Sequence, residues 1–170
     1  MSITDFIRDI KDFPKPGINF KDITPLLGNA EARNECLQLL VSHLKDQKID
    51  KVVGVESRGF FFAMLLAHEL NVGFVPVRKP KKLPFSVISA SYELEYGYDT
   101  LEIHTDAIQK GDWIVIHDDV LATGGTAKAV GELVEKLGGE IVQFNFLMEL
   151  SFLNGREKIK DYQIYSPLLF

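Results

Sequence analysis

The sequence predicts an α/β fold, a single domain with a mostly parallel, twisted sheet and helices on both of its faces. Short β-branched apolar runs alternate along the chain with longer segments whose apolar residues recur every three or four positions. The length of 170 residues suits one domain, and no internal repeat or Ser/Gly-rich linker marks a boundary. Apolar residues make up 46% of the chain and charged residues 25%, the balance of an ordinary globular protein.

The N-terminal part of the chain carries weaker signals. Residues 5–10 are predicted to form a short helix, which ends before Pro14 and Pro16 because prolines forbid helix continuation. Residues 18–22 are then predicted to be extended. Asn29 can cap a helix with an apolar stripe at Cys36, Leu37, Leu40, Val41 and Leu44.

The rest of the chain has the pattern of βαβ units. Apolar runs predict buried strands at residues 51–55 and 113–117. Further strands are predicted at residues 73–78, 141–148 and 162–165. Helical periodicity predicts helices at residues 58–70 and 124–137, the second ended by Gly138-Gly139. Residues 87–95 and 99–103 are predicted to pair as a hairpin. Ligands of such sheets bind beyond the carboxyl ends of the strands, which directs attention to residues 56–59, 78–82 and 118–126.

Composition excludes several classes of protein. Cys36 is the only cysteine, which excludes an intramolecular disulfide and a cysteine-based zinc site and fits a reducing compartment. The acidic N-terminus lacks the pattern of a secretory signal, and residues 59–67, the most apolar stretch, are too few to span a membrane. We therefore expect a soluble cytoplasmic protein. The net charge of −5 argues against nucleic acid as a partner.

The most informative segment is Ile-Val-Ile-His-Asp-Asp-Val-Leu-Ala-Thr-Gly-Gly-Thr at residues 114–126. The predicted strand ends at Asp118 and Asp119, and two carboxylates can accept hydrogen bonds from the paired hydroxyls of a ribose. The glycines of residues 122–126 (Ala122, Thr123, Gly124, Gly125 and Thr126) let backbone N–H groups turn inward at a helix N-terminus, which favours phosphate. Walker and Gly-x-Gly-x-x-Gly motifs do not occur. The segment therefore predicts a site for a phosphorylated ribose.

Cationic residues follow two other predicted strands. Arg78, Lys79, Lys81 and Lys82 form a basic run at the end of one, which suits a pyrophosphate group or, alternatively, a solvated turn. Arg58 follows the strand at 51–55, and its planar fork can bind phosphate oxygens or simply face solvent.

The residues at 114–126 are similar to the phosphoribosyl pyrophosphate signature of the type I phosphoribosyltransferases. Further segments resemble the adenine-specific members of this family, in the family's order over nearly the full chain, at residues 13–25, 56–60, 77–84, 91–97 and 155–158. The resemblance implies the type I phosphoribosyltransferase fold, with an N-terminal hood segment at residues 1–30 and a flexible catalytic-loop hairpin. It also implies a homodimer, and the reaction of adenine with phosphoribosyl pyrophosphate, in the presence of substrate-bound Mg²⁺, to give AMP and pyrophosphate.

The resemblance also assigns roles to residues. Glu95 lies on the loop expected to close over the site, where a carboxylate can take the N9 proton of the base, and Arg58 is the second catalytic residue. Asp118, Asp119 and residues 122–126 are expected to bind the ribose and its 5-phosphate. The pyrophosphate is expected to meet Ser57, Arg58, Arg78, Lys79 and Lys82.

For the base, the resemblance points to the extended segment Asn19, Phe20 and Lys21, with Phe20 as the stacking face. Asn19 stands where an apolar residue is common and Lys21 where arginine is. Ala122 replaces an aspartate that enzymes for 6-oxopurines typically carry, which favours adenine. A transferase for 6-oxopurines or xanthine remains an alternative, as does a non-catalytic regulator that senses phosphoribosyl pyrophosphate.

Overall fold

The structure is a computed structural model that describes residues 2–94 and 97–170. The catalytic candidate Glu95 and its neighbour Tyr96 therefore lie outside the described residues. The chain forms two compact units, Met1–Leu39 and Leu40–Phe170, which are described separately below. The contribution of the hood, residues 1–30, to the base site remains a prediction.

The first unit is built on an antiparallel pair of short strands. A 3₁₀ turn, η1 (Ile3–Phe6), is capped by Ser2 and Asp5 and leads into β1 (Arg8–Lys11), which pairs with β2 (Asn19–Asp22) from Arg8↔Asp22 to Lys11↔Asn19. The helix predicted at residues 5–10 is therefore wrong. The proline-rich turn returns the chain alongside itself, so that β2 offers β1 backbone partners that a short helix would not have. The unit continues with α1 (Thr24–Gly28) and the first turns of α2 (Ala30–Ser42).

The N-terminus of α2 has the predicted cap. The side-chain oxygen of Asn29 accepts a hydrogen bond from the backbone N–H of Ala32, at 2.9 Å, as expected of an N-cap residue. The predicted apolar stripe is buried at every position, from Cys36 to Leu44.

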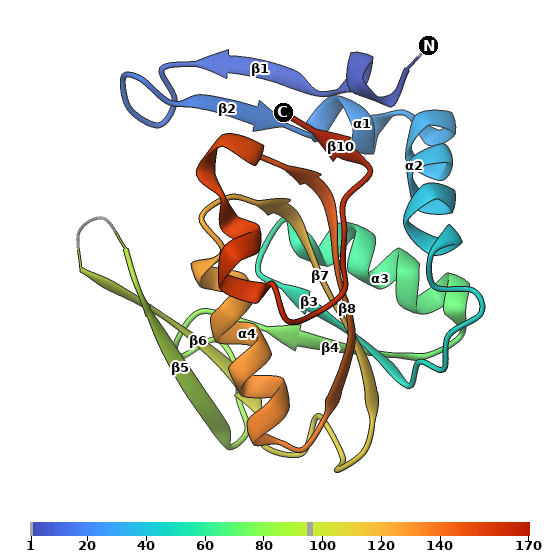
Figure 1. Ribbon diagram of the computed structural model, residues 1–170, viewed down its shortest axis with the longest axis vertical. Helices are drawn as coiled ribbons and strands as arrows, with labels where there is room; N and C mark the ends of the chain where they lie inside the picture. Colours follow the sequence, from blue (N-terminus) through green and yellow to red (C-terminus); the bar gives the residue numbers. More distant parts are fainter. Residues whose placement is uncertain (1, 95–96) are drawn as a thin grey trace. The chain divides into compact units, whose positions relative to one another are not determined.

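The second unit contains a six-stranded sheet in the order β10-β8-β7-β3-β4, with β9 also paired to β8, and every pairing in it is parallel. The strands are β3 (Lys51–Val55), β4 (Gly73–Val77), β7 (Trp113–Leu121), β8 (Glu140–Glu149), β9 (Ile164–Tyr165) and β10 (Leu168–Leu169). The two long helices are α3 (Gly59–Leu70) and α4 (Gly125–Lys136). They lie on opposite faces of the sheet (Figure 1), as right-handed crossovers in opposite directions from the centre require. The predicted fold class is confirmed.

A separate hairpin of β5 (Val87–Glu93) and β6 (Tyr98–His104) packs on the same side of the sheet as α4. The register pairs Tyr92 with Asp99. Alternate residues of the central strands, such as Val53 and Ile116, join Ala90 and Leu101 of the hairpin in one buried cluster. Two 3₁₀ turns, η2 (Ser151–Leu153) and η3 (Gly155–Ile159), connect β8 to β9.

The strand that carries the two carboxylates is longer than predicted. The strand was expected to end at residue 117, but β7 continues to Leu121, because β8 supplies backbone partners as far as Leu121↔Glu149. On the other side, pairing with β3 stops at Gly54↔His117. Asp118 and Asp119 therefore lie where β7 has a neighbour on one side only, and they keep the alternation of a strand.

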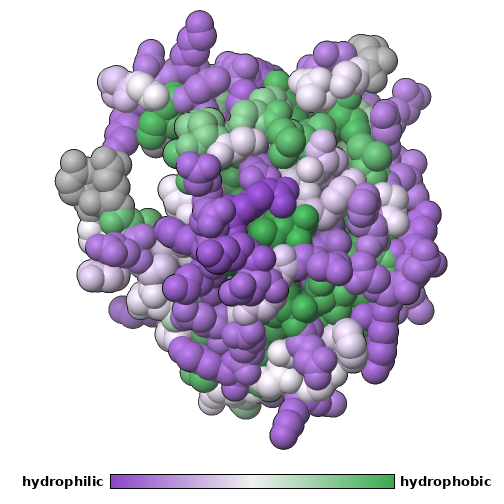
Figure 2. Space-filling model, in the orientation of Figure 1, coloured by the Kyte–Doolittle hydropathy of each residue, from purple (hydrophilic) through white to green (hydrophobic). Residues whose placement is uncertain are grey.

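On the face seen in Figure 2, hydrophilic side chains predominate and leave smaller apolar areas between them. Within the described residues, no helix is both long and apolar enough to cross a lipid bilayer.

Candidate active site

A cavity of about 340 Å³ lies at the carboxyl ends of the central strands of the second unit, where the sequence predicted a site. Its walls come from the turn after β3, the turn after β4, the end of β7 and the start of α4. Six residues with predicted roles line it: Ser57, Arg58, Lys79, Asp118, Asp119 and Thr126. Tyr92 of the hairpin lines it as well.

Asp119 and Arg58 form the charged centre of this cavity. Asp119 is 5% exposed, and its Oδ2 lies 2.9 Å from Nε of Arg58, the residue that precedes α3. Asp119 shares a face of β7 with His117, the face that α3 covers, which explains the contact. Burial raises the pKa of Asp119, against the charge of Arg58, which lowers it.

Asp118 is the second carboxyl of the cavity. Burial raises its pKa well above the usual range, and the neighbouring charge of Asp119 raises it further. Gly59 permits a close approach here, since a Cβ at that position would lie 2.7 Å from Oδ1 of Asp118. The two acids thus form a site where hydrogen bonds from ligand hydroxyls can compensate for burial.

The predicted phosphate loop adjoins the main cavity. A smaller cavity of about 60 Å³ is lined by Asp118, Ala122, Thr123, Gly124 and Thr126, among others. Gly124 has a φ of 81° and directly precedes α4, whose first N–H groups have no partner within the helix. The helix N-terminus therefore adds partial positive charge to a turn that exposes amide donors, a suitable cradle for phosphate.

The backbone of Gly155 packs against the predicted phosphate loop, residues 122–126. A Cβ added to Gly124 would lie 2.3 Å from the carbonyl oxygen of Gly155, and a Cβ added to Gly155 would lie 2.3 Å from the carbonyl oxygen of Ala122. Two backbone segments thus pack directly against each other. The next residue, Arg156, anchors the supporting segment, since its Nε lies 2.8 and 2.7 Å from the two oxygens of the buried Glu149.

In the basic segment after β4, Arg78 pairs with Glu56 and Lys79 lines the main cavity. Nη2 and Nε of Arg78 donate to Glu56 at 3.0 and 3.3 Å, and Glu56 also accepts from the backbone N–H of Lys79 at 2.8 Å. Burial alone would raise the pKa of Glu56, but these hydrogen bonds outweigh it and the pKa is lowered. In the described part of the chain, Lys79 lines the main cavity, whereas Arg78 and Lys82 are not among its lining residues and Lys82 is exposed.

The predicted base-binding residues lie in the first unit, on β2. Asn19 and Lys21 point to one side of the strand, where both donate to Oδ1 of Asp9, at 3.2 and 2.6 Å. Phe20, on the other side, makes an edge-to-face contact with Phe13 at 5.2 Å between ring centres. Hydrogen bonding to Lys21 is the main cause of the lowered pKa of Asp9.

The sequence profile of the phosphoribosyl transferase domain matches residues 26–166. The chain belongs to the phosphoribosyltransferase family. This result confirms the resemblance inferred from the sequence.

Relatives of this phosphoribosyltransferase carry a narrower name. A protein of Flavobacterium johnsoniae named adenine phosphoribosyltransferase is 74% identical over 170 residues, covering the whole of both chains. The crystal structure of the adenine phosphoribosyltransferase of Thermoanaerobacter pseudethanolicus is 53% identical and superposes with a TM-score of 0.97, covering 99% of this chain and 98% of that one. The enzyme of Saccharomyces cerevisiae, crystallised with adenine and an imino-altritol bisphosphate, is 43% identical with a TM-score of 0.90, covering 96% and 95%.

Two features of the site had no clear signal in the sequence of this phosphoribosyltransferase. Gly155 belongs to a segment that supported the family resemblance, but only the structure shows that its backbone packs against the loop. Asp99 lies behind Lys79 and Tyr92 and bonds to both. Its position follows from the hairpin register, which pairs it with Tyr92.

Proposed function

We propose that this protein transfers the 5-phosphoribosyl group of phosphoribosyl pyrophosphate to N9 of adenine, giving AMP and pyrophosphate. Such a pentosyltransferase, a glycosyltransferase of AMP biosynthesis, serves purine salvage. The observation that carries the proposal is the cavity in which two carboxylates, a phosphate loop and the cations Arg58 and Lys79 converge. Full-length similarity to adenine phosphoribosyltransferases supports the choice of base.

In this proposal the donor spans the two cavities. The 5-phosphate occupies the loop of residues 122–126 at the start of α4, and the ribose hydroxyls donate to Asp118 and Asp119. The pyrophosphate extends toward Ser57, Arg58 and Lys79. Arg78 supports this end indirectly, since its guanidinium is held by Glu56. Lys82, exposed on the same segment, reaches the pyrophosphate only if the segment rearranges.

The residues present fit a magnesium ion carried by the donor. Among the described residues, no group of three or more His, Cys, Asp or Glu side chains is placed to hold a metal. Mg²⁺ commonly keeps several waters and binds through one or two carboxylates and substrate phosphates. Asp118 and Asp119 are the carboxylates that could contact it, directly or through water. When bound, the ion would neutralise charge on the pyrophosphate leaving group.

For the base we retain the segment Asn19–Lys21, with Phe20 as the stacking face. Because Asp9 holds the side chains of Asn19 and Lys21, the backbone of β2 is the better candidate for reading the edge of adenine. Ala122 supports adenine over 6-oxopurines, since it offers no carboxylate to N7. The relative from Saccharomyces cerevisiae was crystallised with adenine.

The proposed chemistry needs a proton acceptor for the base and a cation that binds the pyrophosphate leaving group. Glu95, which stands between β5 and β6 in the sequence, would take the N9 proton as the glycosidic bond forms. Arg58 would bind the departing pyrophosphate, and the buried carboxylate of Asp119 keeps its guanidinium oriented toward the cavity. A closed hairpin would exclude the water that could capture the positive charge on the ribose.

We further propose a cytoplasmic homodimer in which the hood, residues 1–30, contributes to the base site. Helix α3 supports an interface between subunits, because Phe61 and Met64 are 48% and 52% exposed on a helix rich in apolar residues.

Purified protein mixed with magnesium-bound phosphoribosyl pyrophosphate and, separately, adenine, hypoxanthine, guanine and xanthine would test the function. We expect AMP and pyrophosphate from adenine at a rate far above that of the other bases. Faster turnover of a 6-oxopurine would contradict the assignment of the base. Tight donor binding without turnover of any purine would indicate a regulator instead.

A further inference from the structure

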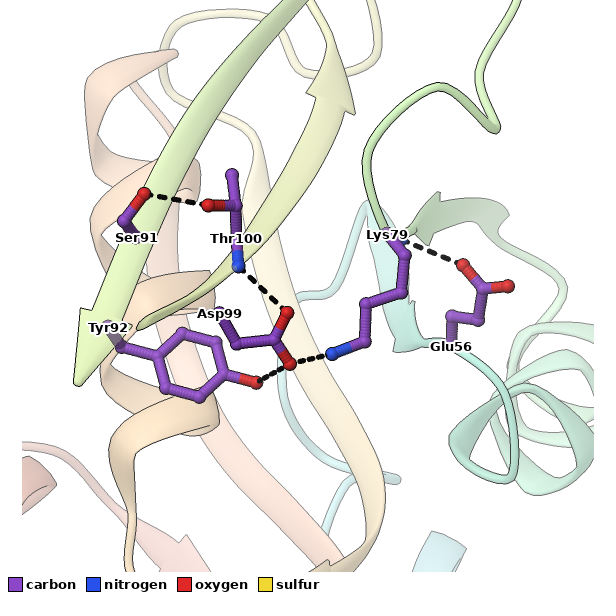
Figure 3. A network of polar contacts seen from close by, with 6 residues as sticks. All are labelled: Glu56, Lys79, Ser91, Tyr92, Asp99 and Thr100. Carbon is purple, nitrogen blue, oxygen red and sulfur yellow. Dashed lines mark hydrogen bonds and ion pairs between the residues drawn. The ribbon is translucent and has the colours of Figure 1, made fainter. Parts of the chain in front are cut away.

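A network of polar side chains crosses the hairpin and reaches the turn after β4. Asp99 of β6 lies between the hydroxyl of Tyr92 and the ammonium of Lys79, as Figure 3 shows. Oδ2 of Asp99 accepts from the Tyr92 hydroxyl at 3.1 Å and pairs with Nζ of Lys79, while Oδ1 accepts from the backbone N–H of Thr100 at 2.9 Å. Both carboxylate oxygens of Asp99 are thus used.

Asp99 lies behind the cavity wall. Lys79 and Tyr92 line the main cavity, whereas Asp99 is not among its lining residues in the described part of the chain. An ammonium has three N–H donors, so that Lys79 can interact with Asp99 and Tyr92 and still donate to a ligand. Burial would lower the pKa of Lys79, but the hydrogen bond to Asp99 and nearby groups raise it, which keeps the ammonium charged.

The same network reaches the phosphate loop. The Tyr92 hydroxyl lies near the side chain of Thr126, and both residues line the main cavity. The Tyr92 ring packs at Gly125, since a Cβ there would lie 3.1 Å from Cδ2 of the ring. One carboxylate therefore connects a cation at one end of the cavity with the phosphate loop at the other.

Backbone hydrogen bonds join the turn after β4 to β6. Arg78 N–H donates to the carbonyl of Glu102 at 3.0 Å, and Glu102 N–H donates to the carbonyl of Arg78 at 2.8 Å. The segment that carries Lys79 is thus attached to β6, the strand of Asp99. These backbone bonds do not fix the long side chain of Lys79. Its ion pair with Asp99 does so.

We propose that Asp99 is a positioning residue for the donor: it holds the Lys79 ammonium at the pyrophosphate end of the cavity before the donor arrives. The inference rests on the proposed function, in which Lys79 meets the pyrophosphate. Binding then avoids much of the entropy cost of immobilising a lysine side chain. AMP has no pyrophosphate, so its affinity does not depend on this contact.

The sign of the effect separates positioning from simple charge repulsion. A carboxylate near an anionic ligand repels it, so that Asp99→Asn would tighten donor binding if repulsion were its main effect. If Asp99 positions Lys79, the same variant weakens donor binding. Asparagine keeps the shape of the side chain and an oxygen that can accept from Tyr92, and it removes the charge that holds Lys79.

The experiment measures dissociation constants by calorimetry for two ligands, magnesium-bound phosphoribosyl pyrophosphate and AMP. The proteins are the unmodified chain, Asp99→Asn, Lys79→Met and the double variant. We expect Asp99→Asn to raise the Kd of the donor about five-fold, the scale of ordering one long side chain, and to change the Kd of AMP less than about two-fold. In the Lys79→Met background, Asp99→Asn should change the Kd of the donor less than about two-fold.

Controls separate the possible failures. Asp106→Asn removes an equal charge from an exposed position after β6 and should leave both constants unchanged. Asp99→Glu restores the carboxylate and should bring donor affinity back toward that of the unmodified protein. An equal loss with and without Lys79, a loss of AMP binding as well, or a gain in donor affinity would each overturn the proposal. If the unmodified protein bound neither ligand, the proposed function itself would fail.

Discussion

The contact between Gly155 and the phosphate loop can be tested by the substitution Gly155→Ala. A Cβ at this position would lie 2.3 Å from the carbonyl oxygen of Ala122 and 3.0 Å from the backbone nitrogen of Gly124. Ordinary van der Waals contact begins at 3.4 Å, so that the oxygen must move by about 1.1 Å (3.4 minus 2.3). Both neighbours are backbone atoms, and no side chain can rotate to make room.

The displacement should affect ligand binding more than stability. Overpacking of this kind typically costs about 1–3 kcal/mol of stability, and each kcal/mol lowers the Tm by about 2–4 °C in a protein of this size. The moved atoms belong to the turn that we propose binds the 5-phosphate. A misplacement of about 1 Å can lower the rate of an enzyme roughly 100-fold. We therefore expect kcat/KM for AMP formation to fall by about two orders of magnitude, with weaker AMP binding, in a protein that still folds.

The assay combines the rate of AMP formation, AMP affinity by calorimetry, and thermal unfolding. Gly28→Ala is the matched control, because a Cβ at Gly28 meets no atom within 4 Å. This control should keep the activity and stability of the unmodified protein. If Gly155→Ala lowered the Tm but left kcat/KM and AMP affinity intact, the supporting role of Gly155 would be refuted.

Three further predictions concern the carboxylates, the hairpin and pH. Asp118→Asn combined with Asp119→Asn should raise the Kd of the donor roughly 10- to 100-fold, because charge-assisted bonds to the ribose hydroxyls are lost; unchanged affinity in calorimetry would exclude this role. Glu95→Gln should lower kcat about 100-fold at unchanged AMP affinity, and an unchanged kcat would remove Glu95 from the mechanism. Burial lowers the pKa of His117 to about 4, against about 6.5 in an unfolded chain. The unfolded state therefore gains a proton at higher pH than the folded state, and stability should fall by about 3 kcal/mol as pH decreases from 6.5 to 4. Urea unfolding at several pH values should show that the stability of His117→Gln lacks this decrease between pH 6.5 and 4. An identical pH dependence of stability in both proteins would contradict the prediction.

Local sequence determined most of the second unit. The strand predicted at residues 51–55 has the bounds of β3, and the helices predicted at residues 58–70 and 124–137 match α3 and α4 to within one residue at each end. These elements combine strong periodicity with clear end signals, which act between residues close in the chain. The convergence of Ser57, Arg58, Lys79, Asp118 and Thr126 around one cavity also follows from the sequence, because parallel strands bring their carboxyl ends to one edge.

Tertiary structure decided what depends on partners distant in the chain. β1 is a strand because β2 folds back beside it, and β7 extends through both carboxylates because β8 runs alongside. No local pattern encodes either partner.

The same distinction applies to the roles of single residues. The sequence placed Arg78 and Lys79 together as equivalent cations, and the structure separates them. Arg78 is held by Glu56, whereas Lys79 reaches the cavity with Asp99 behind it. Charge and spacing are properties of the chain, and they predicted the phosphate loop, whereas the resemblance of its segments indicated the family. Which charge faces a ligand and which faces another side chain depends on contacts that form only when the chain is folded.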